Sequence, residues 1–148
     1  MSGVQKPLDF DVEAEPWNKY EVSDHTIIKT KYVITKVVRV TVNGQANYRI
    51  DGQTLSVVLN MSNDNGPKDT RIYSTQELSS EIKFDNMHYK TLAEEWNEYR
   101  IDDGSVVRLK ATVARVAKTK KYDLNGDPVY LIDNNVMIQI RPPKNPET

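Results

Sequence analysis

The chain of 148 residues contains no cysteine and only two histidines, His25 and His88. The lack of cysteine excludes disulfide bonds, thiolate nucleophiles and cysteine-ligated metals. It also fits a reducing compartment, so we expect a cytoplasmic protein. The two histidines are far apart in the sequence, and His and carboxylate residues do not cluster with the spacing of metal ligands. We therefore expect no metal and no cofactor.

Long hydrophobic runs and an excess of one charge are also missing. No apolar stretch approaches the roughly 18 residues of a membrane-spanning helix. Residues 1–16 are acidic and lack the apolar segment of a secretory signal, so we expect no membrane partner. The 20 basic and 21 acidic residues give a net charge of −1. No overall field therefore draws the chain towards nucleic acid or an anionic membrane.

Local signatures of enzymes are absent as well. The sequence has neither a phosphate-binding loop nor a G-x-G-x-x-G dinucleotide fingerprint. No serine or threonine lies in a recognisable nucleophile motif with a histidine base. We therefore predict a protein with no catalytic residues.

What the chain does contain is a copy of itself. Residues 17–40 read WNKYEVSDHTIIKTKYVITKVVRV, and residues 96–119, 79 positions later, read WNEYRIDDGSVVRLKATVARVAKT. The match has no gap, and most positions that differ keep their chemical type. It resumes at an Asn-Gly pair that lies three residues further along in the second copy. Such a repeat indicates the architecture before any single element is considered.

Each copy has the pattern of strands joined by tight turns, which predicts an all-β fold. Residues 17–22 are rich in aromatic and β-branched types, and long β-branched runs follow at 26–42 and 105–120. Turn signals stand at Asn43-Gly44, Asp51-Gly52, Asn125-Gly126 and Asp133-Asn134-Asn135. We expect two homologous antiparallel meanders, packed as small barrels or as one sandwich or barrel.

The long strand of each copy changes its alternation part of the way along. In the first copy Ile28 and Ile34 stand at even-numbered positions, which would place them on one face of a regular strand, whereas Val37 stands at an odd-numbered position. The second copy changes at the equivalent place. Because side chains on a strand alternate with a period of two, parity changes only where a residue is inserted. We therefore predict β-bulges at 34–37 and 113–116.

The repeats divide the chain into a first β repeat at 8–61, a connector at 62–81, a second β repeat at 82–141 and a flexible tail at 142–148. In the connector, Ser74 and Glu77 have the spacing of a capping box, which predicts a helical turn at 75–80. A second helical turn is expected at 91–95. A meander of about 50 residues is too small to bury a sufficient core, so we expect the two repeats to form one cooperative unit.

Two polar positions of the repeat are explained by turn geometry. His25 stands where the second copy has Gly104, which indicates a conformational role. Asp24 and Asp103 lie in the same turns, where an Asp side chain bonds the nearby backbone. This explanation is favoured over a pair of catalytic acids.

Basic residues gather on the long strands. Residues 26–50 and 105–122 carry five and six cations respectively, and no acid. Equivalent strands of this kind are expected to form one basic surface with two-fold character, which would bind nucleic-acid phosphates. The alternative is a solvated sheet face on which lysines protect edges. The expected nucleic-acid-binding residues are Lys29, Lys31, Lys36, Arg39, Arg108, Lys110, Arg115 and Lys118.

The repeated Trp-Asn-x-Tyr motif supplies candidate aromatic anchors, namely Trp17, Tyr20, Trp96 and Tyr99. They are interpreted either as stacking platforms for bases or anchors for a partner, or as packing residues that the common fold requires.

Together these features predict a non-enzymatic binding protein that binds nucleic acid through its repeated basic strands. The alternative is a protein interaction or scaffold protein without catalytic activity. It would assemble through its sheet edges or aromatics, and its partner would be another protein or a second copy of the chain.

Overall fold

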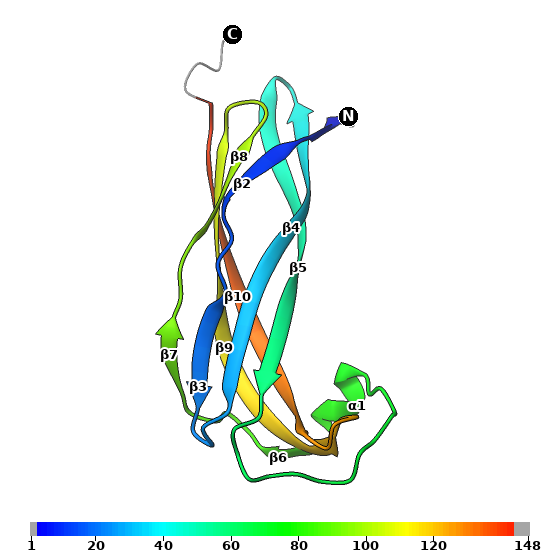
Figure 1. Cartoon of the computed structure of the whole chain (residues 1–148). Coiled ribbons are helices and arrows are strands. Elements are labelled where there is room, and N and C mark those ends of the chain that lie inside the picture. Colours follow the sequence, from blue (N-terminus) through cyan, green and yellow to red (C-terminus); the bar gives the residue numbers. More distant parts are fainter. Residues whose placement is uncertain (1–2, 144–148) are drawn as a thin grey trace.

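The computed structural model describes residues 3–143 and shows an all-β protein with two antiparallel sheets of five strands each (Figure 1). Sheet A contains β1 (Val4–Leu8), β3 (Asn18–Val22), β4 (Ile27–Val42), β5 (Gln45–Leu59) and β7 (Tyr89–Ala93). Sheet B contains β2 (Phe10–Ala14), β6 (Ile82–Phe84), β8 (Asn97–Ile101), β9 (Val106–Tyr122) and β10 (Pro128–Arg141). Within residues 3–143 neither sheet closes into a barrel. Of the architectures expected from the sequence, the two packed sheets therefore correspond to the sandwich.

Each sheet takes one strand from the other repeat. β2 comes from the first repeat but pairs with β8 of the second, and β7 comes from the second repeat but pairs with β3 of the first. The other pairings are equivalent in the two sheets: β4 pairs with β1, β3 and β5, and β9 pairs with β6, β8 and β10. The two repeats are therefore interlocked by a reciprocal exchange of one strand.

Both long strands carry the predicted bulge. The pairing of β4 with β5 skips Thr35, and the pairing of β9 with β10 skips its equivalent, Ala114. Each skipped residue shifts the alternation, which lets Ile34 and Val37 both be buried although their parities differ. The bulges expected at 34–37 and 113–116 are confirmed.

The two long hairpins differ in length, as the offset of the repeat predicts. Asn43 and Gly44 alone join β4 to β5, and their φ angles of 53° and 79° are both positive, as a type I′ turn requires. The second hairpin spans residues 123–127, where Asp123 accepts hydrogen bonds from the backbone N–H groups of Asn125 and Asp127. This longer loop accounts for the three-residue shift between the copies.

Three local predictions are wrong. Asp51-Gly52 and Asp133-Asn134-Asn135 are not turns, because they lie inside the continuous strands β5 and β10. Gly52 faces the bulge of β4, where a Cβ atom would come within 2.5 Å of the Tyr32 ring. The glycine therefore permits close packing instead of a turn. The expected helical turn at 91–95 is also wrong, because residues 89–93 form β7 and pair with β3.

The connector contains the one predicted helix that forms. The helix α1 (Thr75–Ser79) begins at Ser74, and the Ser74 and Glu77 side chains form the expected capping box. No helix in the described part of the chain is long and apolar enough to cross a membrane. The predicted flexible tail begins outside the sheets at Pro142 and Pro143, and its residues 144–148 lie outside the described residues.

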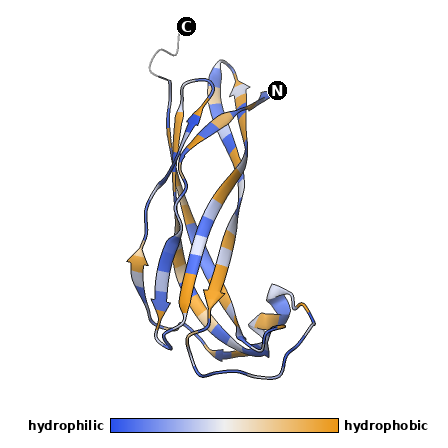
Figure 2. Ribbon diagram, viewed as in Figure 1, coloured by the Kyte–Doolittle hydropathy of each residue, from blue (hydrophilic) through white to orange (hydrophobic). Residues whose placement is uncertain are grey.

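Two apolar clusters fill the space between the sheets, and each draws on both repeats. Ile34 and Val37 of β4 pack in one cluster with Val107 and Leu109 of β9. Ile28 packs in the other cluster with residues of β9 and β10: Val113, Val116 and Tyr130. Hydrophobic and hydrophilic residues accordingly alternate along the strands (Figure 2). Neither repeat has a core of its own.

Candidate functional site

Trp17 and two lysines form a group on the outer face of sheet A, which we call the Trp17 stack (Trp17, Lys29 and Lys31). Lys29 and Lys31 alternate along β4 with the buried Ile28 and Thr30, so they point away from sheet B. Their Nζ atoms lie 5.2 and 5.5 Å from the centre of the Trp17 ring. This is the range of a cation–π interaction. The Trp17 side chain remains exposed.

Sheet B carries the equivalent Trp96 stack (Trp96, Arg108 and Lys110). The Arg108 guanidinium lies 4.7 Å and the Lys110 Nζ 5.8 Å from the centre of the Trp96 ring. Because each stack lies on the outer face of its own sheet, the two stacks face away from each other. The basic strands therefore do not form the one basic surface expected from the sequence.

A glutamate next to each exchanged strand partly neutralises each stack. A carboxylate oxygen of Glu15 lies 3.8 Å from Lys31 Nζ, and one of Glu94 lies 3.7 Å from Lys110 Nζ. Each glutamate also binds a tyrosine that belongs to the other repeat. Tyr99 donates a hydrogen bond of 2.7 Å to Glu15, and Tyr20 donates one of 2.6 Å to Glu94.

Tyr20 and Tyr99 are core residues. Both are fully buried. Burial, together with the hydrogen bond to a glutamate, raises the pKa of both phenols above the usual value. Of the four aromatic anchors expected from the sequence, only Trp17 and Trp96 have any access to solvent.

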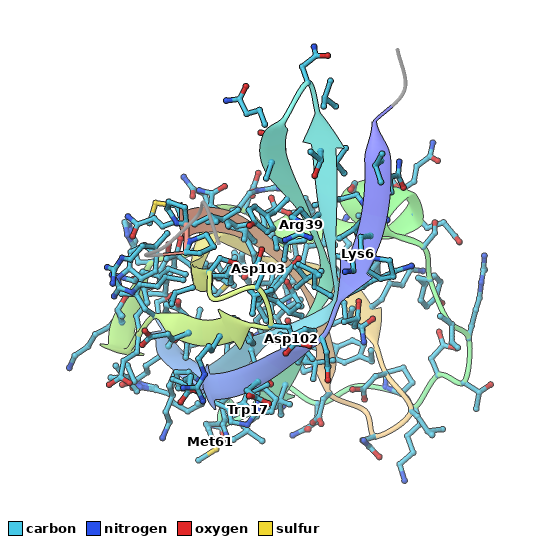
Figure 3. All side chains as sticks on the ribbon, turned by 90° about the horizontal axis from the view of Figure 1, so that it is seen from above. Lys6, Trp17, Arg39, Met61, Asp102 and Asp103 are labelled. Atoms are coloured by element: carbon cyan, nitrogen blue, oxygen red, sulfur yellow. The ribbon has the colours of Figure 1, made fainter. Side chains whose placement is uncertain are left out.

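Arg39 and Lys118 occupy equivalent positions in the repeats, and both are held in ion pairs with the opposite repeat or the connector. Arg39 Nη1 lies 3.2 Å from Asp103 Oδ2 (Figure 3). Lys118 Nζ lies 3.2 Å from Asp24 Oδ2 and 3.0 Å from Asp64 Oδ2, and its side chain is only 5% exposed. Burial alone would lower the pKa of Lys118, but the hydrogen bonds to Asp64 and Asp24 outweigh it and raise the pKa.

Most of the eight expected phosphate-binding cations are thus already paired. Arg115 lies 2.8 Å from Asp85 and 3.2 Å from Asp133 at the surface. The cations that lie in ion pairs are Lys31, Arg39, Lys110, Arg115 and Lys118. Within residues 3–143, Lys29, Lys36 and Arg108 have no carboxylate partner; Lys29 and Lys36 lie on β4 of sheet A, and Arg108 lies on β9 of sheet B.

Three buried or half-buried aspartates have pKa values below the usual range. Burial alone would raise the pKa of Asp24, but hydrogen bonds from Tyr130, Thr26 and Lys118 outweigh it. The same balance lowers the pKa of Asp103, which accepts from Ser105 and Tyr48 and faces Arg39. Asp64 has a lowered pKa because Tyr122 and Lys118 donate to it. These carboxylates hold the two repeats and the connector together.

These aspartates predict a loss of stability in acid. A carboxylate whose pKa is lower in the folded state binds fewer protons there than in the unfolded chain. Its stabilising effect is therefore complete above the unfolded pKa of about 4 and is lost as the pH falls through the folded pKa. We expect the urea midpoint to stay level from pH 7 to pH 5 and to fall below pH 4. The double variant Asp24→Asn/Asp64→Asn should be less stable at pH 7 but change less between pH 5 and pH 3. An equal change in both proteins would contradict the assignment.

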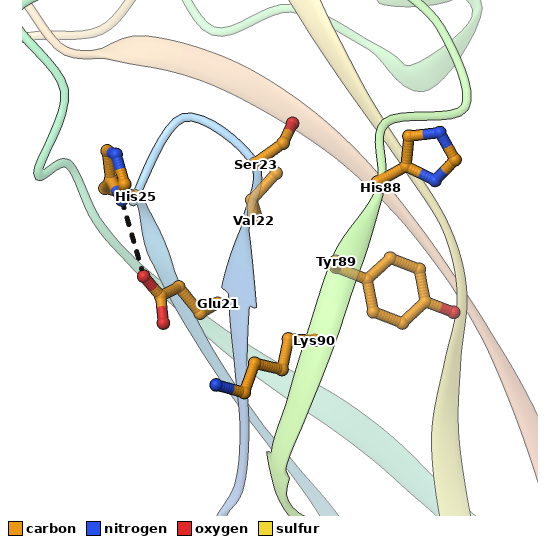
Figure 4. A pocket seen from close by; sticks show the side chains of 7 residues that line it. All are labelled: Glu21, Val22, Ser23, His25, His88, Tyr89 and Lys90. Atoms are coloured by element: carbon orange, nitrogen blue, oxygen red, sulfur yellow. Dashed lines mark hydrogen bonds and ion pairs between the residues drawn. The ribbon is translucent and has the colours of Figure 1, made fainter.

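His25 and His88, which are far apart in the sequence, line one open pocket of about 410 Å³ (Figure 4). Glu21 lies 3.5 Å from His25 Nδ1 in an exposed pair, and the two imidazoles stand on opposite sides of the pocket. Among residues 3–143, no three His, Asp or Glu side chains gather as metal ligands. His25 has a φ angle of 72° and Gly104 one of 90°, which supports the conformational role expected for this position.

The remaining candidate surfaces are the outer edges of the two sheets. β5 pairs only with β4, and β10 pairs only with β9, so within the described residues one side of each strand has no partner strand. Both strands contain an uncharged stretch, which we call the β5 edge segment (52–59) and the β10 edge segment (134–140). Their side chains Leu55, Val57, Leu59, Val136, Ile138 and Ile140 are between 37% and 45% exposed.

Sequence reasoning missed these edges because it placed turns at 51–52 and 133–135. Each turn would have divided one long strand into two paired strands. A signal was present in the spacing, since Leu55, Val57 and Leu59 alternate, as do Val136, Ile138 and Ile140. Alternation predicts a strand with one apolar face, but it does not tell whether a neighbouring strand lies beside it.

The comparisons with known proteins add no relative: no protein-family model matches the chain, and neither the curated proteins nor the solved structures yield a significant match.

Proposed function

We propose that this chain is a non-enzymatic protein that self-assembles through the free edges of its sheets. The observation that carries the proposal is the pair of long edge strands, each with an uncharged apolar segment and, within residues 3–143, a partner strand on one side only. An unpaired edge offers a row of backbone N–H and C=O groups that another strand can satisfy.

Support also comes from the missing protection of these edges. Monomeric proteins usually guard an edge strand with charged side chains, proline, or a covering loop or helix. Neither the β5 edge segment nor the β10 edge segment contains a charge or a proline. Exposed aliphatic side chains along both segments add apolar area that association can bury.

Self-assembly predicts a mass that depends on concentration. We expect sedimentation velocity between about 1 and 200 μM to show a dimer or larger species that becomes more populated as the concentration rises, because edge pairing is a mass-action equilibrium. Apolar and backbone contacts carry little charge dependence, so the equilibrium should change little between 50 and 500 mM salt. A single monomeric species over the whole range would overturn the proposal.

Nucleic-acid binding is the second candidate, and the Trp17 and Trp96 stacks favour it. Each stack combines a solvent-accessible indole with two cations, which is the pairing of stacking surface and charge that single-stranded nucleic acids require. The ion pairs of Lys31 and Lys110 weaken this candidate, because phosphate must compete with Glu15 and Glu94 for these lysines.

If this second function holds, fluorescence anisotropy should detect labelled single-stranded DNA or RNA at low salt. The logarithm of the affinity should then fall with that of the salt concentration, with a slope near −0.7 per phosphate contacted. The quadruple variant Lys29→Glu/Lys31→Glu/Arg108→Glu/Lys110→Glu should lose binding. A control with the same change in charge, Lys68→Glu/Lys83→Glu/Lys90→Glu/Lys120→Glu, should retain more of it. No binding by the parent protein at 20 mM salt would exclude this function.

A further inference from the structure

We infer that the β10 edge segment pairs in antiparallel fashion with the β10 edge segment of a second copy of this chain, so that the two sheets B form one continuous sheet. This inference rests on the proposed self-assembly and names its interface. In this pairing a two-fold axis runs perpendicular to the sheet and passes between the Ile138 residues of the two copies.

The exposed apolar side chains of β10 point to the core-facing side of sheet B. Val136, Ile138 and Ile140 lie opposite Ala111, Leu109 and Val107 of β9, which are all buried. Residues directly opposite each other on paired strands point to the same side of a sheet. The three side chains therefore belong to the inner, core-facing side of sheet B. They are 37–43% exposed because none of the described strands continues the sheet beyond them.

The β10 edge segment is also complementary to itself. With the axis at Ile138, that residue faces Ile138 of the second copy, and Val136 faces Ile140. All three inner apolar side chains then meet apolar partners. On the outer side Met137 faces Gln139. Because residues 134–140 carry no charge, self-pairing brings no like charges together, whereas directly opposed like charges destabilise strand pairing.

The β5 edge does not offer the same complementarity. The inner side of the β5 edge segment carries Gly52, Thr54, Ser56 and, at its end, Val58, opposite the buried side of β4. Its other apolar residues, Leu55, Val57 and Leu59, lie opposite Lys31, Lys29 and Ile27 and so belong to the outer face. A strand added beside β5 would thus extend an inner surface that is polar except at Val58. This contrast selects β10 over its equivalent in the other repeat.

The connector limits the pairing to the second half of β10. The Gly66 N–H donates to the Gly126 carbonyl at 3.0 Å, which ties the connector to the loop before β10. Leu78 of α1 and Val129 of β10 line one pocket, so the helix lies against the start of the strand. The stretch 134–141 lies beyond these contacts, and it is long enough for an antiparallel pair of the usual strand length.

The lack of cysteine allows a direct test by single-cysteine cross-linking in the full chain. In antiparallel pairs opposite Cα atoms are about 4.5–5.5 Å apart, which is within reach of a disulfide. Under mild oxidation Ile138→Cys should therefore form a disulfide-linked dimer in high yield. The matched variant Val57→Cys, on the β5 edge, should give little. Equal cross-linking of both variants would overturn the β10 assignment.

Charge substitution at the same position separates the interface from the fold. Ile138→Lys places two lysines opposite each other and should weaken the dimer by about tenfold or more. Val57→Lys should leave the mass distribution unchanged. Mixing Ile138→Lys with Ile138→Glu should restore a dimer that neither variant forms alone, a result that misfolding cannot produce. If the parent protein forms dimers that Ile138→Lys does not weaken, self-assembly stands and the β10 interface is wrong. If the parent is monomeric, both are wrong.

Discussion

Residues 1–65, expressed without the rest of the chain, should not form a stable monomer, and neither should residues 66–148. The reason is the exchange of strands between the repeats. Without the second repeat, β3 loses β7, and the apolar side of β4 loses every strand of sheet B except β2. A single sheet with one apolar face must be covered by a second layer to be stable. No disulfide can replace that layer, because the chain has no cysteine.

We expect each fragment alone to give a poorly dispersed NMR spectrum and no cooperative thermal transition, or else to self-associate. An equimolar mixture of the two fragments should regain the spectrum of the full chain, because the exchanged strands can then pair. The intact chain should unfold in one transition. A dispersed spectrum from a monomeric fragment would mean that the repeats fold independently and that the exchange is not needed for stability.

Lys118→Met should destabilise the protein by about 3 kcal/mol, which for a chain of this size lowers the Tm by roughly 10 °C. Methionine keeps the volume of the side chain but removes the charge that faces Asp24 and Asp64. Breaking a buried ion pair on one side leaves uncompensated charges. The expected loss lies at the lower end of the range known for breaking a buried ion pair, because the side chains of both aspartates are partly exposed, at 17% and 23%.

Two comparisons isolate this effect in urea unfolding at pH 7. Lys120→Met removes the same charge at an exposed position and should change the free energy of unfolding by less than about 0.5 kcal/mol. Adding Asp24→Asn and Asp64→Asn to Lys118→Met should recover part of the loss, because no unpaired carboxylate then remains. If Lys118→Met and Lys120→Met are equally stable, the buried cluster does not contribute as described.

The exchange also explains why particular residues recur in both repeats. Asn18 donates a hydrogen bond of 2.7 Å to the carbonyl of Ala111, and Asn97 donates one of 2.8 Å to the carbonyl of Tyr32. Tyr20 and Tyr99 bind a glutamate of the opposite repeat in the same reciprocal way. The recurring residues are therefore those that join the repeats, which agrees with the packing interpretation of the Trp-Asn-x-Tyr motif for its Asn and Tyr positions.

The sequence by itself determined the features that depend on neighbouring residues. The β-bulges at Thr35 and Ala114 follow from the parity of the side chains, and the turn at Asn43-Gly44 follows from its tolerance of positive φ. The helix start at Ser74 follows from its spacing to Glu77. The all-β class and the repeat were predictable for the same reason, since both appear in the order of residues along the chain.

Only the tertiary structure decided which segments lie beside one another. Gly52 was predicted to be in a turn, yet it lies in a continuous strand because pairing with β4 outweighs the local preference. Lys118 was expected to bind phosphate, yet it is buried between Asp24 and Asp64, which are 94 and 54 positions away. The free edge of β10 is likewise a property of the arrangement of strands. Pairing between distant segments depends on the shape and charge of the whole fold, so no local pattern could reveal it.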